Sequence, residues 1–392
     1  MFPERFSTLP EYAFPRLRAL LDAHAPGGEV LHMTIGEPRH PFPPWVTGII
    51  AEHAAGFGRY PVNEGMAGLR QAIAGWVTRR YGVTLDPDRH VMALNGMREG
   101  LYNAMMALCP ESKDGKWPKV LIPNPFYQVY MVAALSVGAE PVLLPATRGS
   151  DHLPNFNAVP GEVLSQVTVA YLCSPSNPQG AVATRDDWAD LIGLAELYDF
   201  KVFADECYSE IYRDDPPPGA LQVAREMGAD PERVVVFHSL SKRSNLPGLR
   251  SGFVAGGPET IRRLKQLRAY AGSPLPDPLQ HAAAAVWADE AHVFENRRLY
   301  REKYTLADDI LGDVAGFEPP QAGFFLWLPV EDGERSALKL WRETGVRVLP
   351  GAYLGREVDG ENPGKPYIRA AMVAPKQEMA RGLSRLRDCL YT

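Results

Sequence analysis

The sequence predicts an α/β protein in which a large, doubly wound and mostly parallel sheet is joined to a smaller α+β domain. Short apolar runs alternate with amphipathic segments through the middle of the chain, as in successive β-α units. After about residue 276 this alternation gives way to long helical stretches and shorter strands. A chain of 392 residues is also too long for one core of the usual size, so we expect two domains.

The central runs are nearly continuous in apolar and β-branched residues, which is typical of strands buried on both faces of a parallel sheet. Ligands of such sheets collect at the carboxyl ends of the strands. Amphipathic segments at 185–200 and 258–270 predict helices between strands. The predicted strands span residues 120–125, 140–145, 167–175, 202–207, 234–240 and 251–257.

The smaller domain is predicted from the two ends of the chain. We expect residues 41–280 to form the large domain, and residues 1–40 together with 281–392 to form the small one. A terminal amphipathic helix near KQEMARGLSRLRDCL belongs to the small domain. Its strand-like pieces lie at 324–330, 346–350 and 367–373.

Composition excludes several classes of protein. The formal net charge is −6, and no basic arm or stripe suggests nucleic acid or an anionic membrane as a partner. The four cysteines lie far apart, without the spacing of a zinc site or a disulfide framework, so we expect free thiols and no metal. No apolar stretch reaches the length of a signal core or a membrane span. We therefore expect a cytoplasmic protein.

The most informative segment is HSLSKRSNLPGLRSG, residues 238–252, in which a buried strand runs into Ser239, Ser241 and Lys242. Burial disfavours the charge of a lysine and makes its amine a usable nucleophile toward aldehydes. The two hydroxyls and Arg250 offer the donors that a phosphate needs. The alternative is an ordinary surface loop, and for SxSK alone the two readings are about equal.

Polar residues follow two other predicted strands. Asp205 ends the strand in ADECYSEIY, where a carboxylate can keep a pyridinium nitrogen protonated, and the Tyr208 hydroxyl can bond a phenolic oxygen. Asn177 in CSPSNPQG can reach the same oxygen. Each residue has a common structural alternative, because a lone Asp is more often a helix cap and Asn-Pro is an everyday turn.

Two segments upstream complete the predicted site. In LNGMREGLYNAMMAL the first amides of a helix, at Gly96, Met97 and Arg98, form a natural phosphate cradle. In NPFYQVY the ring of Tyr127 could stack on a pyridine ring. For Tyr127 alone, simple core packing is the more probable alternative.

Taken in order, these motifs resemble the class I/II aminotransferases of the fold-type I family that depends on pyridoxal phosphate (PLP). The resemblance covers nearly the whole chain, and the set is specific as a whole although each motif is weak alone. The motifs are Gly36 in IGEP, Tyr60 in RYPVNEG, Gly96, PxYxxY at 125–130, NPxG at 177–180, DExY at 205–208, SxSK at 239–242, Arg250 and Arg369.

The resemblance implies a role for each residue. Lys242 would carry PLP as a Schiff base and move the proton during catalysis, and Asp205 would pair with the pyridine nitrogen. Asn177 and Tyr208 would bind the phenolic oxygen, and Tyr127 would stack on the ring. The phosphate would be held by Ser239, Ser241, Arg250 and the amides of Gly96, Met97 and Arg98.

The same resemblance implies a homodimer with shared active sites, because Tyr60 would reach the phosphate of the neighbouring subunit. Arg369, whose flanks in YIRAAMV are apolar, would bind the substrate α-carboxylate as a bidentate fork with help from Gly36 and Asn177. The alternative for Arg369 is an arginine on a surface strand.

The residues of several motifs, among them ADECYSEIY and HSLSKRSNLPGLRSGFVAG, resemble those of bacterial succinyldiaminopimelate aminotransferases. That resemblance implies amino transfer between N-succinyl-L,L-diaminopimelate and 2-oxoglutarate in lysine biosynthesis. We expect Arg98 to read the distal carboxylate of the substrate. The alternatives are that Arg98 faces solvent or forms an ion pair with Glu99 or with a neighbouring subunit, and Arg39 is the next candidate.

Other functions fit parts of the pattern. A broad-specificity amino-acid aminotransferase or a carbon–sulfur β-lyase would keep the same cofactor set and differ in the substrate pocket. A PLP-sensing regulator would need a separate basic DNA-binding domain, and the sequence shows no basic arm or stripe of that kind. A nicotinamide dehydrogenase is disfavoured because no GxGxxG follows a first strand.

Overall fold

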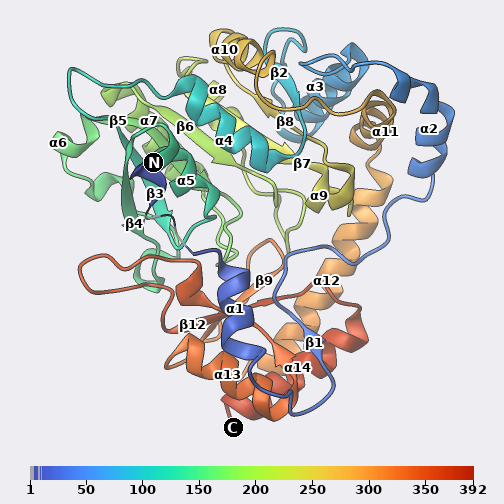
Figure 1. Cartoon of the computed structure of the whole chain (residues 1–392), viewed down its shortest axis with the longest axis vertical. Coiled ribbons are helices and arrows are strands. Elements are labelled where there is room, and N and C mark those ends of the chain that lie inside the picture. Colours follow the sequence, from blue (N-terminus) through green and yellow to red (C-terminus); the bar gives the residue numbers. More distant parts are fainter. Residues whose placement is uncertain (1–3, 8, 10) are drawn as a thin grey trace.

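The computed structural model describes residues 4–7, 9 and 11–392, so part of the predicted 1–40 segment lies outside the described residues. Figure 1 shows a large part built on a broad twisted sheet and a smaller part beside it. The long helix α12 (Ala291–Leu311) runs from the large part into the smaller one. The predicted fold class, a mostly parallel α/β sheet with a smaller α+β part, is confirmed. The domain boundaries stay a prediction.

The large sheet has seven strands in the order β2-β8-β7-β6-β5-β3-β4. Neighbouring strands from β4 to β7 are all parallel, whereas β8 runs antiparallel to both β7 and β2. The strands are β2 (Val91–Leu94), β3 (Lys119–Asn124), β4 (Glu140–Pro145), β5 (Val167–Cys173), β6 (Lys201–Asp205), β7 (Val234–Ser239) and β8 (Gly252–Ala255).

Both faces of this sheet are covered, which explains why its strands are almost uninterrupted apolar runs. In β5, Tyr171 and Cys173 contribute to one hydrophobic cluster, while Ala170 and Leu172 contribute to the cluster on the other face. Helices α4 (Met97–Leu108), α5 (Val129–Ser136) and α10 (Pro258–Arg268) supply the first cluster. Helices α3 (Ala67–Tyr81), α7 (Arg185–Tyr198), α8 (Ala220–Met227) and α11 (Asp277–Ala288) supply the second.

The smaller part contains two short sheets. In one, β1 (Leu31–His32) pairs in parallel with β10 (Val346–Arg347), which brings the N-terminal segment to the C-terminal part. The other is antiparallel in the order β11-β12-β9. Its strands are β11 (Leu349–Pro350), β12 (Tyr367–Ala371) and β9 (Phe325–Pro329). The single strand expected at 346–350 is therefore wrong, because its two halves pair in different sheets.

Amphipathic helices close the smaller part, as expected for the end of the chain. The apolar side of α14 (Lys376–Leu390) buries Met379, Leu383 and Leu386 in the same cluster as the first face of the large sheet. None of the helices in the described part of the chain is long and apolar enough to cross a membrane. The remaining helices are α1 (Ala13–Leu21), α2 (Val46–Glu52), α6 (Gly161–Leu164), α9 (Leu240–Arg243) and α13 (Gly333–Thr344).

Candidate active site

A cavity of about 390 Å³ lies at the carboxyl ends of β5, β6 and β7, where residues of the smaller part also line it. This is the expected place for a ligand of a parallel sheet, and the volume suits a small molecule. Most of the predicted site residues meet in this cavity, although they are spread over the chain. They are Gly36, Met97, Arg98, Tyr127, Asn177, Asp205, Tyr208, Ser239, Ser241, Lys242, Arg250 and Arg369.

Lys242 lies on α9, the one-turn helix that follows β7, rather than on the strand itself. Its ammonium group donates a hydrogen bond to the Gly36 carbonyl and lies 5.3 Å from the ring centre of Phe324. Burial lowers the pKa of Lys242 to about 8, helped by the positive charge of Arg369 and opposed by Cys207. The amine is therefore far closer to its uncharged, nucleophilic form at neutral pH than an exposed lysine.

Asp205 ends β6 and is 2% exposed, with both carboxylate oxygens partnered. One oxygen accepts a hydrogen bond from the Tyr130 hydroxyl at 2.6 Å, and the other accepts one from the Cys207 amide at 3.3 Å. Burial raises the pKa of Asp205, and these hydrogen bonds oppose the rise because they stabilise the charged form. The arrangement holds a carboxylate ready for a cationic partner in the cavity.

Arg369, on β12, is a buried guanidinium whose protein partners are neutral oxygens. It donates to the Asn177 side-chain oxygen and to the Thr34 carbonyl, both at 2.8 Å, and lies 4.0 Å from the ring centre of Phe325. Burial lowers its pKa to about 10. Within the described residues no carboxylate pairs with it, and its Nε has no hydrogen-bond partner. A buried cation of this kind suits the carboxylate of a ligand.

The other end of the cavity has the features of an anion site. Gly96 has a φ of +84° directly before α4, and a Cβ there would lie 2.0 Å from the Arg250 guanidinium. Glycine therefore lets Arg250 approach the first amides of a twelve-residue helix, where the helix dipole favours negative charge. Ser239 and Ser241 line the same cavity. This cradle fits a phosphate group.

Arg98 extends from α4 into the cavity and donates a hydrogen bond from Nε to the Tyr127 hydroxyl at 2.8 Å. The predicted alternative, a pair between Arg98 and Glu99, is not what the structure shows, because Glu99 pairs with Arg268. Tyr127 packs edge-on against Tyr130, with ring centres 5.8 Å apart.

Two predicted residues lie elsewhere. Tyr60 is fully exposed, at 103% of its reference area, and does not line the cavity of its own chain. Arg39, the second candidate for reading a distal carboxylate, instead pairs with Glu378 at 2.7 Å.

Three contacts in the site were missed by the sequence reasoning. Tyr130 belongs to the PxYxxY motif, yet nothing in the motif shows that its hydroxyl reaches Asp205. Phe324 and Phe325, which face Lys242 and Arg369, lie in a segment that was read only as a strand. A Cβ at Gly36 would come within 2.5 Å of Phe325, so these rings also explain the glycine in IGEP.

The charges of the cavity identify the kind of group that it can hold. Four cationic side chains line it, against two carboxylates, Glu37 and Asp205. A phosphate at the helix end, a cationic ring nitrogen at Asp205, an aldehyde near Lys242 and a carboxylate at Arg369 would each meet a complementary group. The residues present therefore fit PLP together with an amino acid. The four cations are Arg98, Lys242, Arg250 and Arg369.

Comparison with known proteins agrees with this chemistry. The family model described as aminotransferase class I and II matches residues 28–386. The chain belongs to this family. Enzymes of the family depend on PLP and transfer an amino group from an amino donor to a 2-oxo acid.

Individual relatives cover essentially the whole chain. An LL-diaminopimelate aminotransferase of Desulforudis audaxviator is 33% identical over 99% of this chain and 97% of its own. An aminotransferase structure from Neisseria meningitidis is 36% identical, with a TM-score of 0.95 and full coverage of both chains. A probable N-succinyldiaminopimelate aminotransferase from Thermus thermophilus is 27% identical, with a TM-score of 0.83 over 96% of this chain and 98% of that one.

The hydrogen bond from Tyr130 to Asp205 leads to a prediction about pH. Tyr130→Phe removes a donor from a buried carboxylate, so the pKa of Asp205 should rise further and its charged form should be lost at a higher pH. A hydrogen bond to a charged group contributes about 1.5–3 kcal/mol, so we expect kcat to fall roughly ten- to a hundredfold. The acid limb of the kcat–pH profile should also move to higher pH.

Tyr171→Phe is the matched control for this measurement. Tyr171 is equally buried and stacks on Tyr130, with ring centres 4.4 Å apart, but its hydroxyl donates to the Leu101 carbonyl rather than to Asp205. The control should leave the pH profile in place. Equal shifts in the two variants would show that packing, and not the bond to Asp205, accounts for the effect.

Proposed function

We propose that this aminotransferase exchanges an amino group between N-succinyl-L,L-diaminopimelate and 2-oxoglutarate in lysine biosynthesis. The observation that carries the proposal is the guanidinium of Arg98 in the cavity, with which no carboxylate of the described residues pairs. Arg369 is suited to the α-carboxylate, and Arg98 adds a cation held by Tyr127 for a further carboxylate. Both proposed substrates carry a distal carboxylate.

The cofactor would be held by the residues that the cavity brings together. When bound, PLP supplies an aldehyde that condenses with amines and a ring that withdraws electrons from the substrate α-carbon. Asp205 would hold the ring nitrogen, Asn177 and Tyr208 the phenolic oxygen, and Tyr127 the ring face. The phosphate would lie between Arg250, Ser239, Ser241 and the first amides of α4.

Lys242 would both attach the cofactor and act as the proton carrier. An amine with a pKa of about 8 exchanges protons readily near neutral pH, which a general base requires. The surrounding rings of Phe324 and Phe325 are fully or almost fully buried, so they keep water away from this amine and from Arg369. A drier site strengthens the interaction of each charge with the substrate.

Unacylated LL-diaminopimelate is a second candidate substrate. It is favoured by the names of relatives that match nearly the whole chain at 31–33% identity. One feature of the cavity also supports it, because the exposed Glu37 carboxylate lines the wall and suits the distal ammonium that only the unacylated substrate has. Kinetic comparison of the two compounds decides between them.

We also propose that the enzyme is a homodimer with shared active sites. Large apolar side chains between residues 42 and 62 are exposed in the single chain, which marks a surface suited to a partner. Tyr60 lies among them and is free to reach the phosphate site of a second copy across a twofold interface. The exposed residues are Phe42, Trp45, Phe57, Tyr60 and Val62.

The assignment of Lys242 is tested by chemical labelling. Borohydride reduction of the holoenzyme should fix the cofactor covalently on the peptide that contains Lys242, as mass spectrometry would show. Lys242→Ala should still bind PLP but not turn over. Lys201 is the internal control, because burial also lowers its pKa although it lies at the opposite end of β6. Label on Lys201, or on any other lysine, would contradict the assignment.

The role of Arg98 is tested with substrates that differ in the distal carboxylate. Arg98→Ala should lower kcat/KM for succinylated diaminopimelate and glutamate about ten- to a hundredfold, the effect of losing a charged hydrogen bond. Activity with alanine should stay within about threefold. Arg39→Ala is the control and should change neither, because Arg39 is engaged with Glu378. Equal losses for acidic and neutral donors would assign Arg98 to the cofactor or the fold.

Shared sites are tested by mixing two inactive variants. If Tyr60 serves the site of the partner subunit, a mixed dimer of Tyr60→Ala and Lys242→Ala has one intact site and one site that carries both substitutions. Random pairing should then restore about a quarter of the full activity. Restoration no greater than the average of the two parents, or an active monomer by light scattering, would exclude the shared site.

A further inference from the structure

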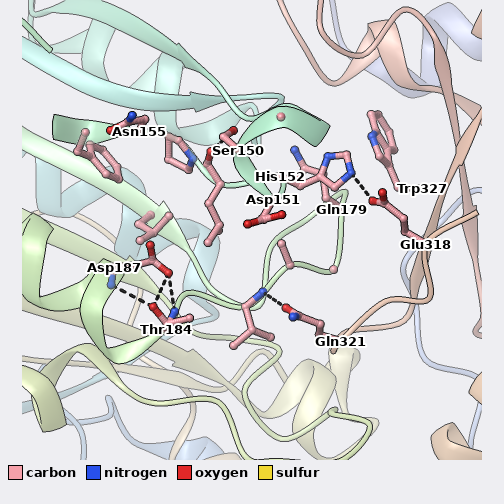
Figure 2. A pocket seen from close by; sticks show the side chains of 18 of the residues that line it. Ser150, Asp151, His152, Asn155, Gln179, Thr184, Asp187, Glu318, Gln321 and Trp327 are labelled. Carbon is pink, nitrogen blue, oxygen red and sulfur yellow. Dashed lines mark hydrogen bonds and ion pairs between the residues drawn. The ribbon is translucent and has the colours of Figure 1, made fainter. Parts of the chain in front are cut away.

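A second cavity, of about 580 Å³, lies beside the active site and is the larger of the two. Figure 2 shows its walls. One wall is the loop 149–157 after β4, another is the stretch 179–184 that begins in the NPQG turn, and a third is 318–321, which precedes β9. Trp327 on β9, Leu172 on β5 and residues 187, 190 and 191 of α7 complete the lining. The aminotransferase reaction as derived above uses none of these residues.

The cavity has the opposite charge to the active site. Four carboxylates line it, and the described lining contains neither lysine nor arginine. Arg148 pairs with one of them, Glu318, at 2.5 Å, which still leaves an excess of negative charge. Anionic walls around a hollow attract cations and repel anionic ligands. The carboxylates belong to Asp151, Asp187, Asp190 and Glu318.

Asp151 is the carboxylate best placed to bind a ligand. Asp187 is used to cap α7 through Thr184, and Asp190 accepts a hydrogen bond from Asn157 at 2.7 Å. In contrast, no side-chain hydrogen bond or ion pair of Asp151 occurs within the part of the chain that the structure describes. Figure 2 shows the Asp151 carboxylate projecting into the cavity, between the wall that carries His152 and the wall that carries Thr184.

The backbone holds Asp151 and His152 in an uncommon conformation. Both have positive φ, +51° and +59°, in a segment without glycine at either position. His152 is fixed from the side by a contact of its Nε2 with Glu318 at 3.0 Å, drawn as a dashed line in Figure 2. This backbone conformation sets the direction in which the Cα–Cβ bond of Asp151 leaves the chain.

One aromatic side chain, Trp327, lines the cavity on the Glu318 side and is 6% exposed. Trp327 stacks on Tyr367, with ring centres 4.8 Å apart and an interplanar angle of 13°, so its ring is held rigidly. Leu153 and Phe156 add apolar surface from the opposite loop. A rigid ring beside carboxylates suits an organic ammonium ion, whose charge meets the acids and whose carbon body meets the ring.

The two cavities share structural elements. Asn177 lines the active site, and Gln179 to Val182 of the same turn line the second cavity. On β5, Cys173 faces the first and Leu172 the second. Trp327 is the direct cross-strand partner of Arg369 in the β9–β12 pair. A molecule in the second cavity therefore touches the chain on both sides of the Arg369–Asn177 pair.

We propose that the second cavity binds a small organic ammonium ion with a short apolar body, and that its occupancy changes the affinity of the Arg369–Asn177 pair for the substrate carboxylate. The coupling passes through the 177–182 turn and the paired strands β9 and β12. It acts on KM for the amino donor, because Arg369 and Asn177 would hold the substrate carboxylate.

The test uses N,N-dimethylbutylamine, a tertiary amine that is charged at neutral pH and cannot condense with an aldehyde. Calorimetric titration into the holoenzyme should show one site per chain. 1-Pentanol, an uncharged molecule of similar length, should bind at least ten times more weakly. At saturating amine, KM for the amino donor should change at least threefold.

Asp151→Asn and Asp186→Asn form a matched pair for the same titration. Both residues are exposed, but Asp186 does not line the cavity. Asp151→Asn should weaken binding of the amine at least tenfold and abolish the KM change, whereas Asp186→Asn should behave as the unchanged enzyme. No binding, or equal binding by the two variants, would overturn the site. Binding without a change in KM would overturn the coupling. Neither result depends on which amino donor is the natural one.

Discussion

The structure depends on burying the Arg369 guanidinium without a carboxylate of its own. Removing a charge from water costs several kcal/mol, and neutral oxygens from Asn177 and Thr34 recover only part of it. The cost is tolerated because the two halves of the chain meet here. β12 supplies the arginine, the turn after β5 supplies the amide, and the segment after β1 supplies the carbonyl. In the proposed function a substrate carboxylate would supply the missing anionic partner of Arg369.

The remaining site residues follow from the order of the parallel strands. β5, β6 and β7 are neighbours and run in one direction, so the residues that follow them, Asn177, Asp205 and Lys242, come together at one edge. The burial of apolar residues on both faces of these strands stabilises the sheet. This stabilisation offsets the free-energy cost of keeping Asp205 and Lys242 away from water. The same strands therefore form the core along their length and the site at their carboxyl ends.

This geometry explains what the sequence could and could not predict. Motifs at strand ends, such as those of Asn177 and Asp205, were predictable because a parallel sheet leaves few places where strand ends can lie. Side-chain partners such as Tyr130 with Asp205 were not, since sequence spacing does not give the direction of a hydroxyl group. The split at 346–350 was hidden because two residues can change sheets without altering the apolar pattern. Tyr60 faces solvent in the single chain, and its role at the phosphate site of a second copy stays a prediction.

The alternation of β5 has a consequence beyond the first site. Successive side chains of a strand point to opposite faces, and of two neighbours on β5, Cys173 lines the active-site cavity and Leu172 the second cavity. The cavity on one side is lined by four cations and two carboxylates, and the cavity on the other by carboxylates alone among its charged groups. Opposite charge keeps carboxylate ligands out of the second cavity even though it is larger. The sheet thus places two chemically distinct cavities against one turn, which supplies Asn177 to the first and Gln179 to the second.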